Sequence, residues 1–192
     1  MSLGYWETLV SINADGTALT AAARASLTQG ASATGARYTL PGGKLSRIGD
    51  MIEVKAYGRI SSVITTPGTA RFDLSMGGTA IMDSLAILLD TVAGHTTVGW
   101  VLEMTGTLRQ NGTTANLMWG GKWTCEDILG VPATAPKGCL TAILPWNTAP
   151  AVSANFDSTV SQLLDLQFTQ TVATGSCTLH QLSIAIMTST GF

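Results

Sequence analysis

The two histidines are the residues of this chain best suited to acid–base chemistry, because an imidazole ionises near neutral pH. His95 and His180 lie far apart in the sequence, and only scattered serines and carboxylates flank them. A Ser-His-Asp site is defined by geometry, so one could still assemble in three dimensions. However, the Gly-x-Ser-x-Gly signature of a nucleophile elbow is absent. The sequence therefore favours a turn position for His95 and an outer strand face for His180 over catalysis.

Two further patterns suggest catalysis only superficially. The run Gly42–Ser46 is similar to a phosphate-binding loop, but Leu45 stands where a Ser or Thr must follow the lysine, and Tyr38 replaces the first glycine. Glu126 and Asp127 form a carboxylate pair, yet adjacent residues of a strand point to opposite faces and cannot share a substrate. We therefore expect neither enzyme activity nor a cofactor.

The three cysteines, Cys125, Cys139 and Cys177, are odd in number and widely spaced. A disulfide framework pairs cysteines evenly, and a zinc site clusters them with histidine. The sequence therefore predicts buried, reduced thiols in a chain made in a cytosol, and no metal.

Charge and hydropathy narrow the range of partners. Only 11% of the 192 residues are charged, 45% are hydrophobic, and the net charge is −2. No basic run concentrates the positive charge that a nucleic acid requires. The longest apolar run, Leu85–Leu89, is far shorter than the roughly 20 residues of a membrane helix, and the start of the chain lacks the pattern of a signal peptide. The mean hydropathy of +0.30 suggests apolar surface covered by other subunits.

Alternation of apolar and polar residues with a period of two dominates the sequence, which predicts β-strands. Any binding site of this chain is therefore expected to be held by strands. In the segment 51–60, Ile52, Val54 and Ile60 fall on one face, while Glu53 and Lys55 fall on the other. Similar alternation covers 71–76, 98–109, 117–124, 164–172 and 181–186. In the segment 71–76, Phe72, Leu74 and Met76 are expected to point inward, and Asp73 and Ser75 are expected to point outward to water.

Turn signals separate these segments. Thr66–Thr69 suits a type II turn, with proline fixing φ and glycine taking the positive φ. Gly77-Gly78 predicts a two-residue hairpin, and Asn111-Gly112 predicts a type I′ turn between two long strands. We therefore expect a jelly-roll-like antiparallel β-sandwich of about eight strands, formed as a single domain by residues 1–192.

Two stretches do not alternate. Ala18–Leu27 is rich in alanine and is compatible with either a short helix or an ordered arm. Gly130–Pro150 holds four of the six prolines and is expected to form a long loop (130–150). The apolar segment Met1–Asn13 leaves two alternatives open: the start of an N-terminal arm (1–36) that reaches outside its own sandwich, or a first strand paired in the domain's own sheet.

The five tryptophans fall into two groups. Trp100, Trp119 and Trp123 lie on faces predicted to point inward, which favours core packing over a sugar-binding platform. Trp6 and Trp146 lie on peripheral segments, where tryptophan is typical of subunit contacts.

The segment Leu40–Ser61, LPGGKLSRIGDMIEVKAYGRIS, resembles a recurring segment of the virion proteins of tailed bacteriophages. In those proteins a lead of the form L-P-x-x-x-L-x-x-x-G-D enters a strand that ends in A-x-G-R-I-S. Shorter pieces look similar too, and the likeness extends loosely from about Asn13 to Ile186. The resemblance implies a structural component of the virion and carries over no functional residue. The shorter similar pieces are Thr66–Thr69, Ala149–Ala151, Phe156–Thr159 and Thr178–Gln181.

These observations lead to one functional hypothesis and two alternatives. We expect a capsid decoration (cement) protein that is made in the host cytoplasm and carried on the virion. It is expected to form a homotrimer and to bind the major capsid protein. We expect it to bind neither nucleic acid nor a membrane. The alternatives are a tail or fibre component that binds a receptor, and a carbohydrate-binding module. The expected capsid or subunit contacts are Tyr5, Trp6, Leu9, Ile12 and Trp146.

Overall fold

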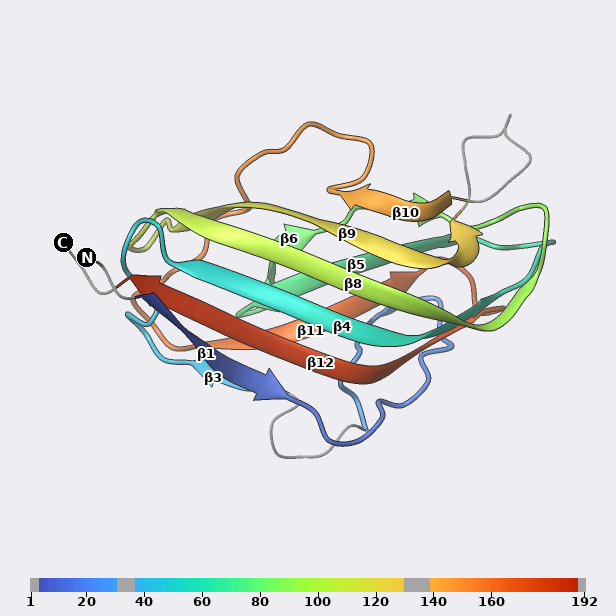
Figure 1. Ribbon diagram of the computed structural model, residues 1–192, viewed down its shortest axis with the longest axis horizontal. Helices are drawn as coiled ribbons and strands as arrows, with labels where there is room; N and C mark the ends of the chain where they lie inside the picture. The colour runs from blue at the N-terminus through green and yellow to red at the C-terminus, as the bar shows by residue number, and fades with distance from the viewer. Residues whose placement is uncertain (1–3, 31–36, 130–138, 190–192) are drawn as a thin grey trace.

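The computed structural model describes residues 4–30, 37–129 and 139–189, and within these ranges the chain contains strands and no helix (Figure 1). All the strand pairings are antiparallel, and two sheets pack face to face, so the prediction of an antiparallel β-sandwich is confirmed. Twelve strands are described, more than the expected eight, because short strands flank the long ones. They are β1 (Gly4–Ser11), β2 (Arg24–Ser26), β3 (Tyr38–Leu40), β4 (Met51–Ser62), β5 (Thr69–Met76), β6 (Thr79–Asp83), β7 (Ile87–Leu88), β8 (His95–Gln110), β9 (Asn116–Leu129), β10 (Cys139–Leu144), β11 (Gln162–Gln170) and β12 (Ser176–Ser189).

The two sheets interleave strands from all parts of the chain. Sheet A has the order β1-β12-β4-β8-β9-β10, and sheet B has the order β2-β11-β5-β6, with β3 added beside β11 and β7 beside β5. Figure 1 shows sheet A as the near layer, with β5, β6 and β11 behind it. The first and last strands of the described chain are therefore neighbours in sheet A.

The alternation predicted for 51–60 is confirmed in β4. Ile52, Val54, Ala56 and Ile60 are at most 1% exposed, whereas the residues at positions 53, 55, 57 and 59 are half-buried or exposed. The same two-residue period runs along β8, where every second residue from Trp100 to Leu108 is buried. The apolar faces of these strands turn toward sheet B.

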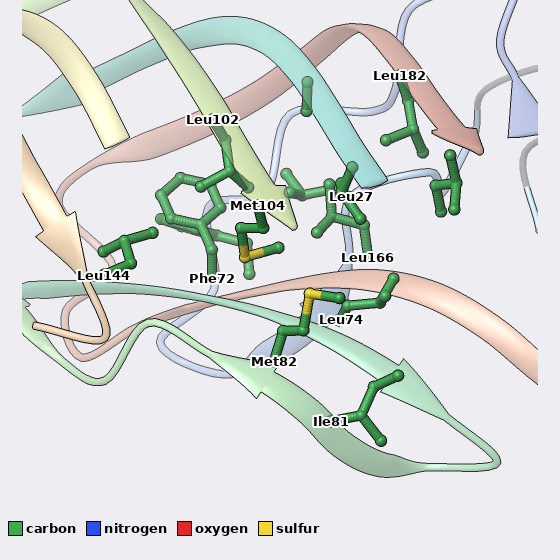
Figure 2. Close-up of a cluster of buried hydrophobic side chains, with 14 of the residues drawn as sticks. Leu27, Phe72, Leu74, Ile81, Met82, Leu102, Met104, Leu144, Leu166 and Leu182 are labelled. Carbon is green, nitrogen blue, oxygen red and sulfur yellow. The ribbon is translucent and has the colours of Figure 1, made fainter. Parts of the chain in front are cut away.

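The core lies between the sheets and centres on Phe72 of β5. Its ring centroid lies 5.1 Å from Trp100, 5.0 Å from Trp123 and 5.1 Å from Phe168. Trp119 is also buried, so the prediction that these three tryptophans point inward is confirmed. Figure 2 shows how side chains of the two layers meet, with Leu102 and Met104 facing Phe72, Leu74 and Met82.

Sheet B buries polar residues on the face turned away from this core. The sequence predicted that Asp73 and Ser75 face water, but they are 0% and 3% exposed, so that prediction was wrong. The Arg24 guanidinium binds both Asp73 carboxylate oxygens. Ser26 Oγ donates a hydrogen bond of 2.6 Å to Asp165. Side chains from β2 thus cover this face and satisfy its charges.

One predicted turn is confirmed and one is wrong. Gly77 and Gly78 join β5 to β6, with φ angles of 58° and 88°, as a two-residue hairpin requires. The β8–β9 hairpin forms, but residues 111–115 connect the strands, and Asn111 is not in the positive-φ region, so the turn is not type I′. Neighbouring loops widen it: Asn111 Nδ2 donates to Ser46 O, and Gly112 N donates to Ser158 Oγ.

The possible N-terminal arm (1–36) was one of two alternatives left open, and the described residues 4–11 instead form a strand of sheet A. Strand β1 pairs with β12 along its whole length, from Gly4 opposite Ser189 to Ser11 opposite Ser183. Val10 of this strand is 1% exposed and belongs to the core, and Leu9 packs against the core. The second alternative, a first strand in the domain's own sheet, is the one observed.

The other two irregular stretches also contain strands. Within 18–27 there is no helix; Leu19 bridges to Cys177 and β2 forms at residues 24–26. The long loop predicted for 130–150 is interrupted by β10, because residues 139–144 pair with β9. Residues 130–138 of that prediction lie outside the described residues.

Candidate functional site

The five residues expected to make capsid or subunit contacts lie in different environments. Trp6 is 47% exposed on β1. Leu9, Ile12 and Trp146 are only partly buried and pack against the core. The side chain of Tyr5 lies outside the described residues. Of these positions, Trp6 presents the most apolar surface for a partner.

An exposed isoleucine on the opposite edge of sheet A complements Trp6. Ile143 of β10 is 70% exposed and lies opposite Lys122 of β9. In the described chain β1 pairs only with β12, and β10 only with β9. At both edges of sheet A, therefore, the outer side of the edge strand has no partner strand in the described chain, and the strand carries a large exposed apolar side chain. Sequence reasoning assigned Ile143 to a loop and missed it.

The two histidines each contact a carboxylate. His95 Nε2 lies 3.1 Å from Asp90 Oδ2, and His180 Nδ1 lies 2.9 Å from Asp15 Oδ1. Within the described residues neither imidazole is hydrogen-bonded to a serine, so no Ser-His-Asp arrangement forms there. His95 begins β8 rather than lying in a turn, and His180 is a bulged residue of β12 that is one-third exposed.

Asp90 shows how its loop is stabilised. Burial acts to raise the pKa of Asp90, but hydrogen bonds from Val92 N, the His95 ring and Ala93 N outweigh it and lower the pKa below 3.8. This arrangement closes the turn that leads into β8. It is a structural role rather than a catalytic one.

The thiols are placed as the sequence predicted where the structure describes them. Cys125 and Cys177 are buried. Burial raises the pKa of the Cys177 thiol far above its ordinary value, so the reactive thiolate is suppressed. The Cys139 side chain lies outside the described residues. No group of three or more His, Cys, Asp or Glu residues suited to a metal ion occurs in the described ranges.

A hollow of about 610 Å³ lies on the outer face of sheet A. It crosses four neighbouring strands, β12, β4, β8 and β9. Its outward-facing side chains are those of Tyr57, Arg59, Val101, Thr124, Glu126 and Gln181, with Gly99 in the middle. Tyr57 and Gln181 also line a second hollow of about 370 Å³, so the two hollows adjoin.

The strand register explains the position of the first hollow. Arg59 lies opposite Gly99, and because Trp100 pairs with Cys125 the next residue, Glu126, lies beside Gly99 on the other side. Across the three adjacent strands β4, β8 and β9, the outer face thus carries the Arg59 guanidinium, a position without a side chain at Gly99, and the Glu126 carboxylate. The gap exists because Gly99 has no side chain. No single motif in the sequence signals this site, because its residues come from four separate strands.

A scan against protein-family models finds no match, and a search of curated proteins finds no significant similarity. Within the described residues no helix has the length and hydropathy needed to span a membrane.

Proposed function

We propose that this protein is a structural component of a tailed-bacteriophage virion, a decoration protein that oligomerises on the head and stabilises the shell. The observation that carries the proposal is the pair of open edges of sheet A. Trp6 at one edge and Ile143 at the other expose 47% and 70% of their surface. Monomeric proteins usually protect such edges with charge or proline, so an apolar open edge favours pairing with another chain.

The positions of these two residues favour a closed ring. Because Trp6 and Ile143 lie on opposite edges, the β10 edge of one subunit meets the β1 edge of the next in a head-to-tail contact. Such contacts close into a ring when the rotation between subunits allows it, and a ring of three matches the proposed homotrimer. The ring would bind the major capsid protein in the assembled shell. A protein that binds the assembled shell but not the free subunits shifts the equilibrium toward the shell and so stabilises it.

Two further observations support the virion assignment. The order β1-β12-β4-β8 in sheet A against β2-β11-β5-β6 in sheet B supports a jelly-roll architecture, which is frequent among viral capsid proteins. The Leu40–Ser61 segment that resembles phage virion proteins runs from the end of β3 through a turn and along most of β4. There Asp50 accepts hydrogen bonds from Ser46 N (3.1 Å) and Arg47 N (2.9 Å), so the G-D pair of that motif is structural. The motif thus belongs to the scaffold rather than to a catalytic centre.

The first experiment measures assembly in solution and on capsids. Light scattering of the purified protein should give about three times the subunit mass of 19.9 kDa. Trp6→Ser and Ile143→Ser should each reduce the oligomer to monomers and abolish co-sedimentation with capsids that lack the protein. Ile64→Ser, at an exposed isoleucine in the loop after β4, is the matched control and should change neither. A monomer that also fails to bind capsids would contradict the proposal.

The second experiment counts copies per virion by quantitative mass spectrometry and cryo-EM. Hundreds of copies on the head are expected for a decoration protein. A dozen copies or fewer at the tail would replace this proposal with the tail or fibre alternative.

A further inference from the structure

We propose that the hollow on the outer face of sheet A binds a neutral saccharide chain. Neither hollow is lined by Trp6 or Ile143, the two residues that carry the proposed assembly. The hollow's volume of about 610 Å³ lies within the range of small-molecule sites, and its continuation past Tyr57 by a further 370 Å³ gives room for more than one sugar unit.

Two exposed charged side chains of the hollow, Arg59 and Glu126, differ from the charged pairs next to them on this face. Lys55 is paired with Glu53 at 3.0 Å, and Lys122 with Glu103 at 2.9 Å. In the described chain Arg59 and Glu126, by contrast, have no ion-pair or hydrogen-bond partner, although they lie on either side of Gly99.

Gly99 leaves the Glu126 carboxylate open to a ligand. A Cβ built at Gly99 would lie 3.4 Å from Glu126 Oε1 and within 4 Å of no other atom. The carboxylate therefore reaches over the floor of the hollow, while Arg59 faces it from the neighbouring strand. The two groups offer hydrogen-bond donors on one side and an acceptor on the other.

The chemistry of these groups identifies the class of ligand. A sugar hydroxyl both donates and accepts, so a row of hydroxyls can satisfy the Arg59 donors, the Glu126 acceptor and the Gln181 amide together. A purely apolar partner would remove water from these groups and leave them without hydrogen-bond partners, which is unfavourable. An anionic ligand would gain from Arg59 but would be repelled by Glu126. The two opposite charges thus favour a neutral, polyhydroxylated ligand.

Tyr57 supplies the other half of a saccharide site. It is 41% exposed and lies between the two hollows. An aromatic ring on an open sheet face provides a flat apolar surface, and the C–H groups of a pyranose form a matching apolar face. A sugar chain would therefore stack on Tyr57 while its hydroxyls reach the polar groups on either side.

The test uses the full chain and titrates it with cellohexaose, maltohexaose, xylohexaose and chitohexaose by calorimetry and saturation-transfer NMR. At least one of them should bind, and Tyr57→Ala and Glu126→Gln should each weaken that binding at least tenfold. Glu103→Gln, the same substitution outside the hollow on the same face, should leave it unchanged.

A glycine substitution tests the hollow itself without removing a contact. Gly99→Val should fill the floor and abolish binding while preserving the fold, since nothing but the Glu126 carboxylate lies near the added carbon. Gly120→Val is the matched control, because Gly120 is on the same face and a Cβ there meets only Leu144 O at 3.7 Å. Failure of all four oligosaccharides to bind, or binding that survives Gly99→Val, would overturn the proposal. Because Trp6→Ser should leave sugar binding intact, failure here is distinguishable from failure of the assembly proposal.

Discussion

The indole of Trp100 occupies the space that a side chain at Gly58 would need. A Cβ built on Gly58 would lie 2.5 Å from Trp100 Cζ2 and 2.1 Å from the backbone oxygen of Thr178. Gly58 and Trp100 are directly paired neighbours on β4 and β8. The glycine therefore lets the tryptophan lie flat against the sheet and reach Phe72 of sheet B.

From this contact we predict that Gly58→Ala destabilises the protein. Because a backbone oxygen and a buried indole both crowd the new methyl group, the strand must shift, and overpacking of this kind costs about 1–3 kcal/mol. Urea unfolding followed by tryptophan fluorescence measures the loss. Gly120→Ala is the control, because a Cβ at Gly120 meets only Leu144 O at 3.7 Å, and an equal effect of the two substitutions would contradict the explanation.

The β8–β9 turn gives a second prediction. Gly112 has a φ of 92° although the turn is not type I′, so Gly112→Val should still be strained by at least about 1 kcal/mol. A Cβ at Gly112 meets no atom within 4 Å, so strain rather than collision is the cause. Gly112→Asn should cost less, because asparagine tolerates positive φ better than valine. Equal melting temperatures for the valine variant and the parent would show that the backbone relaxes freely there.

The third prediction concerns the buried charge of sheet B. Arg24→Ala leaves the Asp73 carboxylate, which is fully buried, without its main partner. Breaking fully buried pairs costs 3–5 kcal/mol, and since 39% of the Arg24 side chain is exposed we expect about 2–3 kcal/mol. Adding Asp73→Asn to Arg24→Ala should restore part of the stability.

Arg71→Ala is the control for this prediction. The side chain of its partner Asp83 is 25% exposed, so water can hydrate the Asp83 carboxylate when the arginine is removed. A similar loss in both arginine variants would show that Asp73 is not specially dependent on Arg24.

Asp90 gives a pH-dependent prediction. Since hydrogen bonds hold its pKa in the folded state below the ordinary 3.8, its contribution to stability is fully present above that value. The contribution is lost as the pH falls through the lowered folded value. Asp90→Asn should therefore flatten the dependence of the unfolding free energy on pH below about pH 4, and His95→Gln should flatten it partly. Unchanged pH profiles for both variants would contradict this account.

The fifth prediction follows from the position of β1. Deletion of residues 1–12 removes a whole strand from sheet A together with the buried side chain of Val10. The truncated protein should lose most of its stability or its folded circular dichroism spectrum. A deletion variant with full stability would restore the arm interpretation that the structure has replaced.

Period-2 patterning and turn residues were sufficient to predict the sandwich. The alternation in β4 determined which residues are buried, and Gly77-Gly78 fixed the β5–β6 hairpin. Patterning failed at Asp73, because a sequence in isolation does not show that Arg24, 49 positions away, will cover the outer face of β5. It failed at Asn111 because the turn is shaped by Ser46 and Ser158, which belong to other loops.

The candidate sites were harder to predict than the fold. Trp6 was identified from its type and its peripheral position alone. Ile143 was missed because prolines on both sides of β10 suggested a loop. The hollow was missed because Arg59, Gly99 and Glu126 become neighbours only through the registers of β4, β8 and β9, which alternation does not determine.

The position of β12 has a consequence for how this chain is made. It lies inside sheet A, between β1 and β4, yet it is the last of the described strands in the sequence, so it is synthesised after both of its neighbours. Until then β4 has an unpaired edge that is free to pair with other nascent chains. Joining Gly4 to Ser189 also requires the two ends of the described chain to meet, and pairings so distant in sequence form slowly. Translation that stops before β12 should therefore give aggregates rather than a smaller folded domain.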